Sequence, residues 1–214
     1  MRVVPKKTSK FVSVLQKHIK ENAKAYFITS IIILIGIVLG VIFVNNLSDI
    51  QKQDIHKYFN DFTSNLKNGS TIDKGQLLKK SLINNIILVL FMWFVGSTVI
   101  GIPIVYAIVL FRGFSIGYTI SAGVAAFGIG KGALFCITSM LLHNLIFVPC
   151  IIALAVSGSK LYKSILKDKR KENIKFEIFR HTIFSGLMLG ILAISAVVET
   201  YISSNLLLIF ISYF

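Results

Sequence analysis

The chain has 214 residues, of which 55% are hydrophobic and 15% charged, and its formal net charge is +14 at pH 7. The apolar residues lie in long runs rather than in amphipathic stripes, which excludes an ordinary soluble domain and indicates an integral membrane protein. The excess positive charge lies in the segments that flank these runs, where lysines meet anionic lipid head groups, so we expect a lipid bilayer and no nucleic acid as a partner.

The N-terminal segment, residues 1–25, carries seven of the 23 positive charges. Its apolar residues share one helical face between Phe11 and Ile19, which predicts a basic amphipathic helix on the cytosolic membrane surface. The first membrane span is expected at residues 26–44. It contains Gly36 and Gly40, whose four-residue spacing is typical of helix–helix contacts in membranes.

A polar segment, residues 45–81, follows the first span. Ser48 and Gln51 have the spacing of a capping box and Asn68-Gly69 provides a stop, so we expect an amphipathic helix from Asp49 to Lys67. The expected cover for its apolar face is the outer leaflet or the bundle, and the alternative is a partner protein. In the second case the partner-binding residues are Ile55, Tyr58, Phe59, Phe62 and Leu66.

The most apolar part of the chain, residues 81–156, contains only two charged side chains, Arg112 and Lys131. These two charges divide it into three runs, and a span needs about 20 apolar residues. We therefore expect membrane spans at residues 82–111, 113–130 and 132–156.

Glycine and proline shape these spans. Pro103 lacks a backbone N–H and its ring crowds the preceding turn, so a kink is expected within span 82–111. Span 113–130 is rich in small residues, and Gly113 and Gly117 repeat the contact spacing. Such helices pack closely, either within one bundle or between copies, which makes a homo-oligomer one possible assembly.

The last part of the chain consists of a basic loop, residues 157–181, and a final span at 182–212 that contains Gly186 and Gly190. With five spans and a cytosolic N-terminus, sixteen Lys and Arg residues lie inside and seven outside. The positive-inside rule therefore predicts an N-in, C-out topology, with the segment 45–80 outside the cytosol. The predicted fold class is an all-α membrane bundle that forms a single domain over residues 1–214.

Three polar side chains are expected at membrane depth: His143, Asn144 and Glu199. A functional interpretation places them on a solute or proton path, because ionisable groups in membranes usually face the bundle interior or water. A structural interpretation, which we favour, gives them interhelical hydrogen bonds.

Catalytic, cofactor and metal sites are not expected. Residues Gly113 to Gly117 match the G-x-S-x-G pattern of hydrolases, but that elbow requires a strand before it, and here an apolar helix is predicted. The four histidines are far apart and lack metal-ligand spacing. Cys136 and Cys150 are 14 residues apart on one predicted helix, too distant for a disulfide.

Several short motifs follow one another in a fixed order along the chain. They are Gly36 with Gly40, Val44-Asn45-Asn46-Leu47, Gln53, Tyr58-Phe59-Asn60-Asp61-Phe62, Asn84, Arg112-Gly113-Phe114-Ser115-Ile116-Gly117-Tyr118, Leu142-His143-Asn144 with Pro149, and Glu199-Thr200-Tyr201-Ile202-Ser203. In this order and spacing the chain resembles the stage II sporulation protein M family over nearly its whole length.

This resemblance implies a five-span, non-enzymatic protein of a spore-forming bacterium that acts in engulfment of the forespore. It also implies that the protein lies in the mother-cell membrane at the sporulation septum, where it holds two peptidoglycan hydrolases, stage II sporulation proteins D and P. The alternative is a transporter or permease subunit for a small solute, which interrupted helices and polar residues at mid-membrane depth favour.

Overall fold

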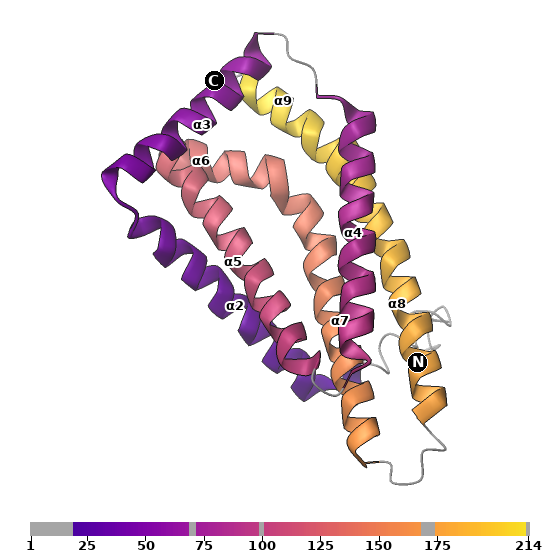
Figure 1. Ribbon diagram of the computed structural model, residues 1–214. Helices are drawn as coiled ribbons and strands as arrows, with labels where there is room; N and C mark the ends of the chain where they lie inside the picture. The colour runs from indigo at the N-terminus through magenta and orange to yellow at the C-terminus, as the bar shows by residue number, and fades with distance from the viewer. Residues whose placement is uncertain (1–18, 69–71, 99–100, 168–173, 213–214) are drawn as a thin grey trace, which may run out of the picture.

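The computed structural model describes residues 19–68, 72–98, 101–167 and 174–212. Within these ranges every regular element is a helix (Figure 1). Five helical stretches are long and apolar enough to cross a membrane, which confirms the predicted all-helical class and the number of spans. They are Ala23–Asn45, Lys74–Gly96, Gly101–Phe127, Ile129–Leu166 and Ile174–Ile211. The amphipathic helix expected near the N-terminus falls on residues 1–18, outside the described residues.

The helices follow one another along the chain with two π-helical turns among them. They are α2 (Ala23–Asn45), α3 (Asp49–Lys67), α4 (Lys74–Gly96), α5 (Gly101–Phe127), α6 (Ile129–Cys136), the π-turn η1 (Ile137–Leu141), α7 (Leu142–Lys167), α8 (Ile174–Val197), the π-turn η2 (Val198–Ser203) and α9 (Ser204–Ser212). Each π-turn joins two α-helices into one long stretch, α6 to α7 and α8 to α9.

The helices form two groups (Figure 1). The first is the pair α2 and α5, which run side by side, and the second contains α4, α7 and α8. The groups meet toward the lower end of Figure 1, around a core that includes Val109, Ile151 and Leu192. They diverge toward the upper end, where α3, α6 and α9 lie, and smaller apolar clusters fill that end.

The pair α2 and α5 is held together by glycines on both helices. A Cβ atom added to Gly40 would lie 2.6 Å from the backbone nitrogen of Tyr118, and one added to Gly117 would lie 2.9 Å from the Cα of Ile37. Gly36 and Gly113 also face backbone of the opposite helix. Because only hydrogen fits at these positions, the backbones approach closely enough for Cα–H···O contacts.

The third glycine pair has a different environment. A Cβ atom added to Gly186 or to Gly190 would have no heavy atom of another element within 4 Å, and both residues are exposed on α8. The structure therefore uses two of the three glycine pairs for contacts within the chain, while the pair on α8 faces outward.

The expected kinked span at 82–111 is instead divided between two helices. At the end of α4, the Ser97 hydroxyl donates to the Trp93 carbonyl (2.7 Å) and the Thr98 hydroxyl to the Val95 carbonyl (2.8 Å), which satisfies carbonyls left open at the helix end. Gly101 lies so close to the Val95 carbonyl that no Cβ fits. Pro103 is the third residue of α5, where a backbone N–H is not needed, so it begins a helix rather than kinking one.

This division changes the position of Arg112, which was expected to end a span. Arg112 lies within α5, about 16 Å from the helix start at 1.5 Å per residue, and the expected separate span at 113–130 is the second half of that helix.

The basic loop expected at 157–181 is largely helical, because α7 continues to Lys167 and α8 begins at Ile174. Ser157 and Gly158 of this region are buried, and each contacts another helix. Gly158 faces Gly96, with an added Cβ 3.2 Å from its Cα. The hydroxyl of Ser157 lies 2.8 Å from the Nδ1 atom of His181.

The bounds of the helices leave the expected N-in, C-out topology unchanged as a prediction. With Arg112 inside a span, the segments at the two ends of the bundle carry fifteen and seven Lys and Arg residues, and the larger number still adjoins the N-terminal end of α2.

We expect a cysteine at position 60 to be labelled from outside and one at position 163 only from the cytosol. Asn60 is exposed on α3 and Lys163 is exposed near the end of α7, so both thiols would be accessible to solvent. The measurement is labelling by a membrane-impermeant maleimide, before and after permeabilisation, in a background where Cys136 and Cys150 are replaced by alanine. Labelling in the opposite order would contradict the N-in, C-out topology.

Candidate functional site

The helix α3 begins and ends where the sequence predicts, at Asp49 and Lys67. The hydroxyl of Ser48 accepts from the backbone N–H of Gln51 (3.4 Å), and the side-chain oxygen of Gln51 accepts from the backbone N–H of Ser48 (3.1 Å). This reciprocal capping box satisfies amides that would otherwise lack partners and sets the first turn of the helix.

The apolar face of α3 lies on the bundle. The ring of Phe59 is 5.5 Å from the rings of both Phe127 and Phe135, edge-on in each case. Ile55 is 9% exposed and packs in a cluster with Val44. Phe62 and Leu66 pack on the cluster formed by α6 and α9.

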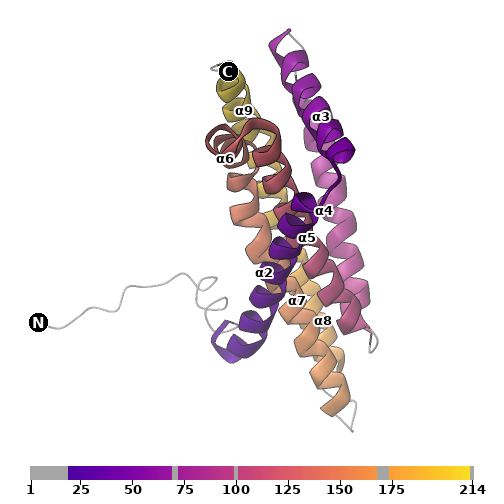
Figure 2. The same cartoon turned by 90° about the vertical axis from the view of Figure 1, so that its left-hand side faces the viewer.

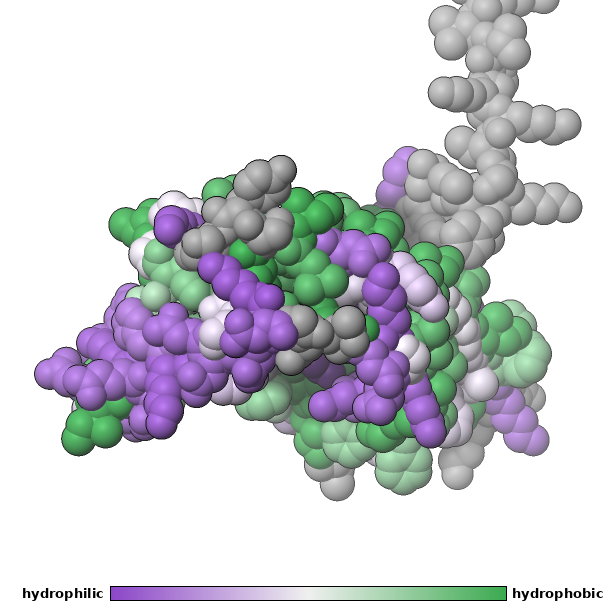
Figure 3. Space-filling model, turned by 90° about the horizontal axis from the view of Figure 1, so that it is seen from above, coloured by the Kyte–Doolittle hydropathy of each residue, from purple (hydrophilic) through white to green (hydrophobic). Residues whose placement is uncertain are grey.

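The expected cover was the outer leaflet or the bundle, and the structure shows the bundle. Four of the five residues considered for partner binding contact the chain itself, because α2, α5, α6 and α9 offer them apolar surface. Tyr58 is the fifth residue and remains 68% exposed. Figure 2 shows α3 on one side of the upper end and α6 with α9 on the other, and Figure 3 shows hydrophilic side chains over α3.

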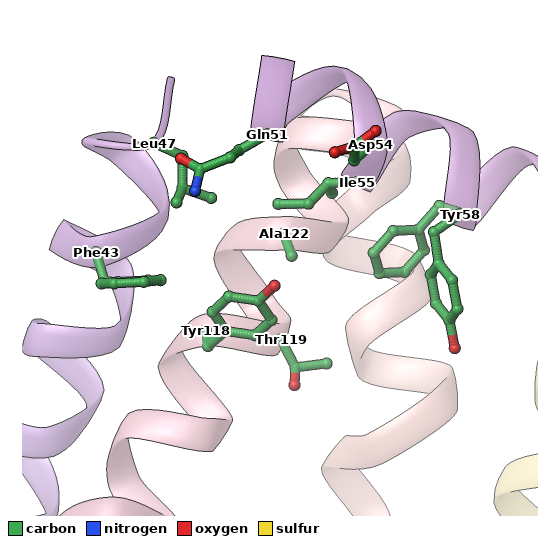
Figure 4. Close-up of a pocket in the computed structure, with 10 residues that line it drawn as sticks. Phe43, Leu47, Gln51, Asp54, Ile55, Tyr58, Tyr118, Thr119 and Ala122 are labelled. Atoms are coloured by element: carbon green, nitrogen blue, oxygen red, sulfur yellow. The ribbon is translucent and has the colours of Figure 1, made fainter. Parts of the chain in front are cut away.

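A pocket of about 680 Å³ opens between α3 and the upper parts of α2 and α5 (Figure 4). Its lining is mainly apolar and aromatic, with Asp54 and Gln51 of α3 among the lining residues. Figure 4 shows Tyr58 and Ile55 of α3 opposite Tyr118, Thr119 and Ala122 of α5. The full lining is Phe43, Leu47, Gln51, Asp54, Ile55, Tyr58, Phe59, Tyr118, Thr119 and Ala122. We call it the outer pocket.

A second candidate site lies where the π-turns η1 and η2 contact one another. His143 is the second residue after η1 and Glu199 belongs to η2, and π-turns are frequent at functional sites. The His143 Nδ1 atom is 2.9 Å from the Ser195 hydroxyl and 3.7 Å from the Glu199 carboxylate. The hydroxyl of Ser81 donates to that carboxylate at 2.5 Å. The contact between His143 and Glu199 thus joins two of the three predicted polar residues.

Residues from four elements surround a cavity of about 330 Å³ beside this contact. Arg112 of α5 enters it with its guanidinium carbon 5.0 Å from the centre of the Phe147 ring. The amide of Asn85 donates to the Leu192 carbonyl (3.0 Å), which ties α4 to α8. The lining residues are Leu77, Lys80, Ser81, Asn84, Asn85, Arg112, His143, Phe147 and Glu199. We call it the inner cavity.

Asn144 does not join the inner cavity. It lines a separate and mainly apolar cavity with Cys136 and Met140. The sequence interpretation also missed Ser81 and Ser195, which contact Glu199 and His143, and Arg112 and Asn85, which line the inner cavity. A signal for two of them exists, because Ser81 and Asn85 are four residues apart and so share one face at the polar end of an apolar run.

The residues considered for catalysis are engaged elsewhere. Ser115 of the G-x-S-x-G pattern lies within α5, and its hydroxyl donates to the Phe111 carbonyl of the same helix (2.9 Å). Within the described ranges, no three His, Cys, Asp or Glu side chains lie close enough to hold a metal ion together. Cys136 and Cys150 are both buried and not joined to each other.

Comparison with known proteins finds a matching family and a distant relative. A family model described as stage II sporulation protein M matches residues 29–204. An uncharacterized protein of Methanocaldococcus jannaschii is 24% identical over 184 residues, which are 84% of this chain and 93% of that protein. No solved structure matches the chain. The family match includes α3 and all residues of both the outer pocket and the inner cavity.

Proposed function

The chain belongs to the stage II sporulation protein M family, and from this premise we propose that it is a non-enzymatic membrane scaffold of sporulation. In this proposal it recruits peptidoglycan hydrolases, stage II sporulation proteins D and P, and anchors them at the mother-cell side of the septal membrane during engulfment. The observation that carries the proposal is the helix α3, which is formed and fixed on one end of a multi-pass bundle.

A fixed helix is suited to recruitment because little conformational entropy is lost when a partner binds a surface that is already ordered. The Phe59 ring contacts α5 and α6 at once, so α3 is anchored to the bundle at its centre. With the predicted topology, α3 lies outside the cytosol, where peptidoglycan hydrolases work. The apolar face faces inward and therefore serves the anchoring, while the opposite side remains open.

The outer pocket is the proposed point of contact. Tyr58 presents most of its ring beside the pocket, and aromatic side chains next to apolar pockets commonly dominate interface energetics. Asp54 lines the same pocket and can accept hydrogen bonds from a basic or amide group of the partner. An apolar or aromatic anchor of a hydrolase would fill the space between Tyr58 and Tyr118 (Figure 4).

Replacing Tyr58 by serine is expected to weaken recruitment of both hydrolases about tenfold, since an anchor residue contributes at least about 1.4 kcal/mol. The matched control is Asn60→Ser, also exposed on α3 but outside the outer pocket. The measurement is the amount of each labelled hydrolase at the septum, together with co-purification from detergent. Normal recruitment by Tyr58→Ser would contradict the contact, and normal recruitment in cells without the chain would contradict the scaffold function itself.

The inner cavity favours a second function, a subunit of a small-solute transporter, because several polar side chains surround it at membrane depth. Flux assays on liposomes that contain the purified chain separate the two functions. A transporter moves solute by itself, whereas a scaffold produces no flux.

A further inference from the structure

We propose that the inner cavity binds one phosphate group, held between the guanidinium of Arg112 and the ammonium of Lys80. This inference is independent of hydrolase recruitment, because it rests on the charges of the cavity and not on α3. The ligand class is a phosphate ester or free phosphate, and the two sources differ in whether an acyl chain accompanies the phosphate.

The charges that face the cavity do not balance. Lys80 and Arg112 are cationic, and Glu199 is the one carboxylate in the lining. The Glu199 carboxylate is already engaged by the Ser81 hydroxyl and lies near His143. Among the described residues, no carboxylate lies within ion-pair distance of Arg112. A guanidinium within a span is costly unless an anion or other polar partner accompanies it.

The donors in the cavity suit phosphate oxygens. Arg112 of α5 offers a rigid fork of N–H groups that can bind two oxygens of one phosphate, and Lys80 of α4 offers a compact positive charge in the same lining. Asn84, one turn after Lys80 on the same helix, adds an amide. The ring of Phe147 holds the guanidinium from one face, which leaves its edge available.

The surface next to the cavity mouth favours a lipid as the source of the phosphate. Lys80 and Asn84 are exposed on α4, and the residues that continue this helix toward mid-membrane expose apolar side chains. Ile87 is 59% exposed, Phe91 49% and Phe94 65%, at steps of three and four residues. An acyl chain can therefore lie along this stripe of α4 while its head group occupies the cavity.

The test measures retention of lipid by the full chain, purified in dodecyl maltoside, with native mass spectrometry. We expect one dioleoylphosphatidylglycerol to be retained in preference to dioleoylphosphatidylcholine, whose choline offsets the phosphate charge. Arg112→Gln should lower the affinity about tenfold and Lys80→Gln several-fold. Lys79→Gln is the matched control, since Lys79 is the neighbouring exposed lysine and does not line the cavity.

Inorganic phosphate added to the same samples separates the two sources. Displacement of the lipid by phosphate would assign the site to the phosphate group alone, and retention of the lipid would assign it to a lipid head group with its chains. Equal loss of affinity in Lys79→Gln and Lys80→Gln, or equal retention of both lipids, would overturn the proposal. If Arg112→Gln fails to fold, the comparison of Lys79→Gln with Lys80→Gln still tests the proposal. Both lysines are exposed on α4, so neither substitution disturbs the core.

Discussion

Replacing Gly117 by leucine is expected to abolish accumulation of the folded chain in the membrane. The added side chain would collide with the backbone of Ile37, whose Cα lies 2.9 Å from an added Cβ. A backbone cannot rotate away as a side chain can, so α2 and α5 would have to separate along their whole contact. Overpacking of a core typically costs about 1–3 kcal/mol, and loss of a complete helix pair costs more.

The chain offers a matched control for this substitution. Gly186→Leu and Gly190→Leu introduce the same side chain at the same glycine spacing, where an added Cβ meets nothing within 4 Å. We expect both variants to be expressed and to elute from size exclusion in detergent like the parent chain. Normal elution and yield of Gly117→Leu would show that α2 and α5 do not depend on the close approach.

Replacing Phe59 and Phe62 together by serine is expected to release α3 from the bundle. Phe59 contacts Phe127 and Phe135, and Phe62 packs on the cluster that contains Leu207. Truncation of a buried phenylalanine costs roughly 3–5 kcal/mol, and these partly buried rings lie toward the lower value. The double variant should therefore lose hydrolase recruitment because the helix is no longer held, and not because a contact residue is missing.

Amide hydrogen exchange over residues 49–67 distinguishes these two causes. In the double variant we expect fast exchange along the whole helix, since an isolated helix of this length is marginal in water. In Tyr58→Ser, which removes an exposed ring, exchange should match the parent chain. Unchanged protection in the double variant would show that the bundle does not hold α3 through these rings.

Features set by neighbouring residues were predicted well from the sequence. The capping box of Ser48 and Gln51 and the bounds of α3 depend on contacts within four residues, and such contacts can be read from the sequence. The number of spans follows from the length of the apolar runs. Neither prediction requires knowledge of which helices are neighbours.

Features set by distant residues were predicted poorly. Arg112 reads as the end of a span because a single charge interrupts an apolar run, yet α5 continues through it. The ring that its guanidinium contacts, Phe147, comes from an element far along the chain. Asn144 was grouped with His143 because they are adjacent, but consecutive residues of a helix point about 100° apart and so face different cavities.

The amphipathic pattern of α3 illustrates the same limit. Its spacing shows that one face needs cover, and it carries no information on whether lipid, a partner or the chain itself provides it. The answer depends on α6 and α9, which are distant in sequence and present apolar side chains to Phe59, Phe62 and Leu66.

The π-turns also determine what a change in chain length does to this protein. A π-turn holds about one residue more than the α-helical turn it replaces, so deleting one residue between 137 and 141 would leave a continuous helix rather than a broken one. Because the shortened turn still completes one revolution, the deletion would keep α6 oriented on α7 and Phe135 against Phe59, whereas a deletion in a regular α-helical turn would rotate the two flanking parts by about 100°. Single-residue gaps in relatives at this point or within residues 198–203 would therefore mark proteins that keep the packing of this end of the bundle and have a regular α-helical turn in place of the π-turn.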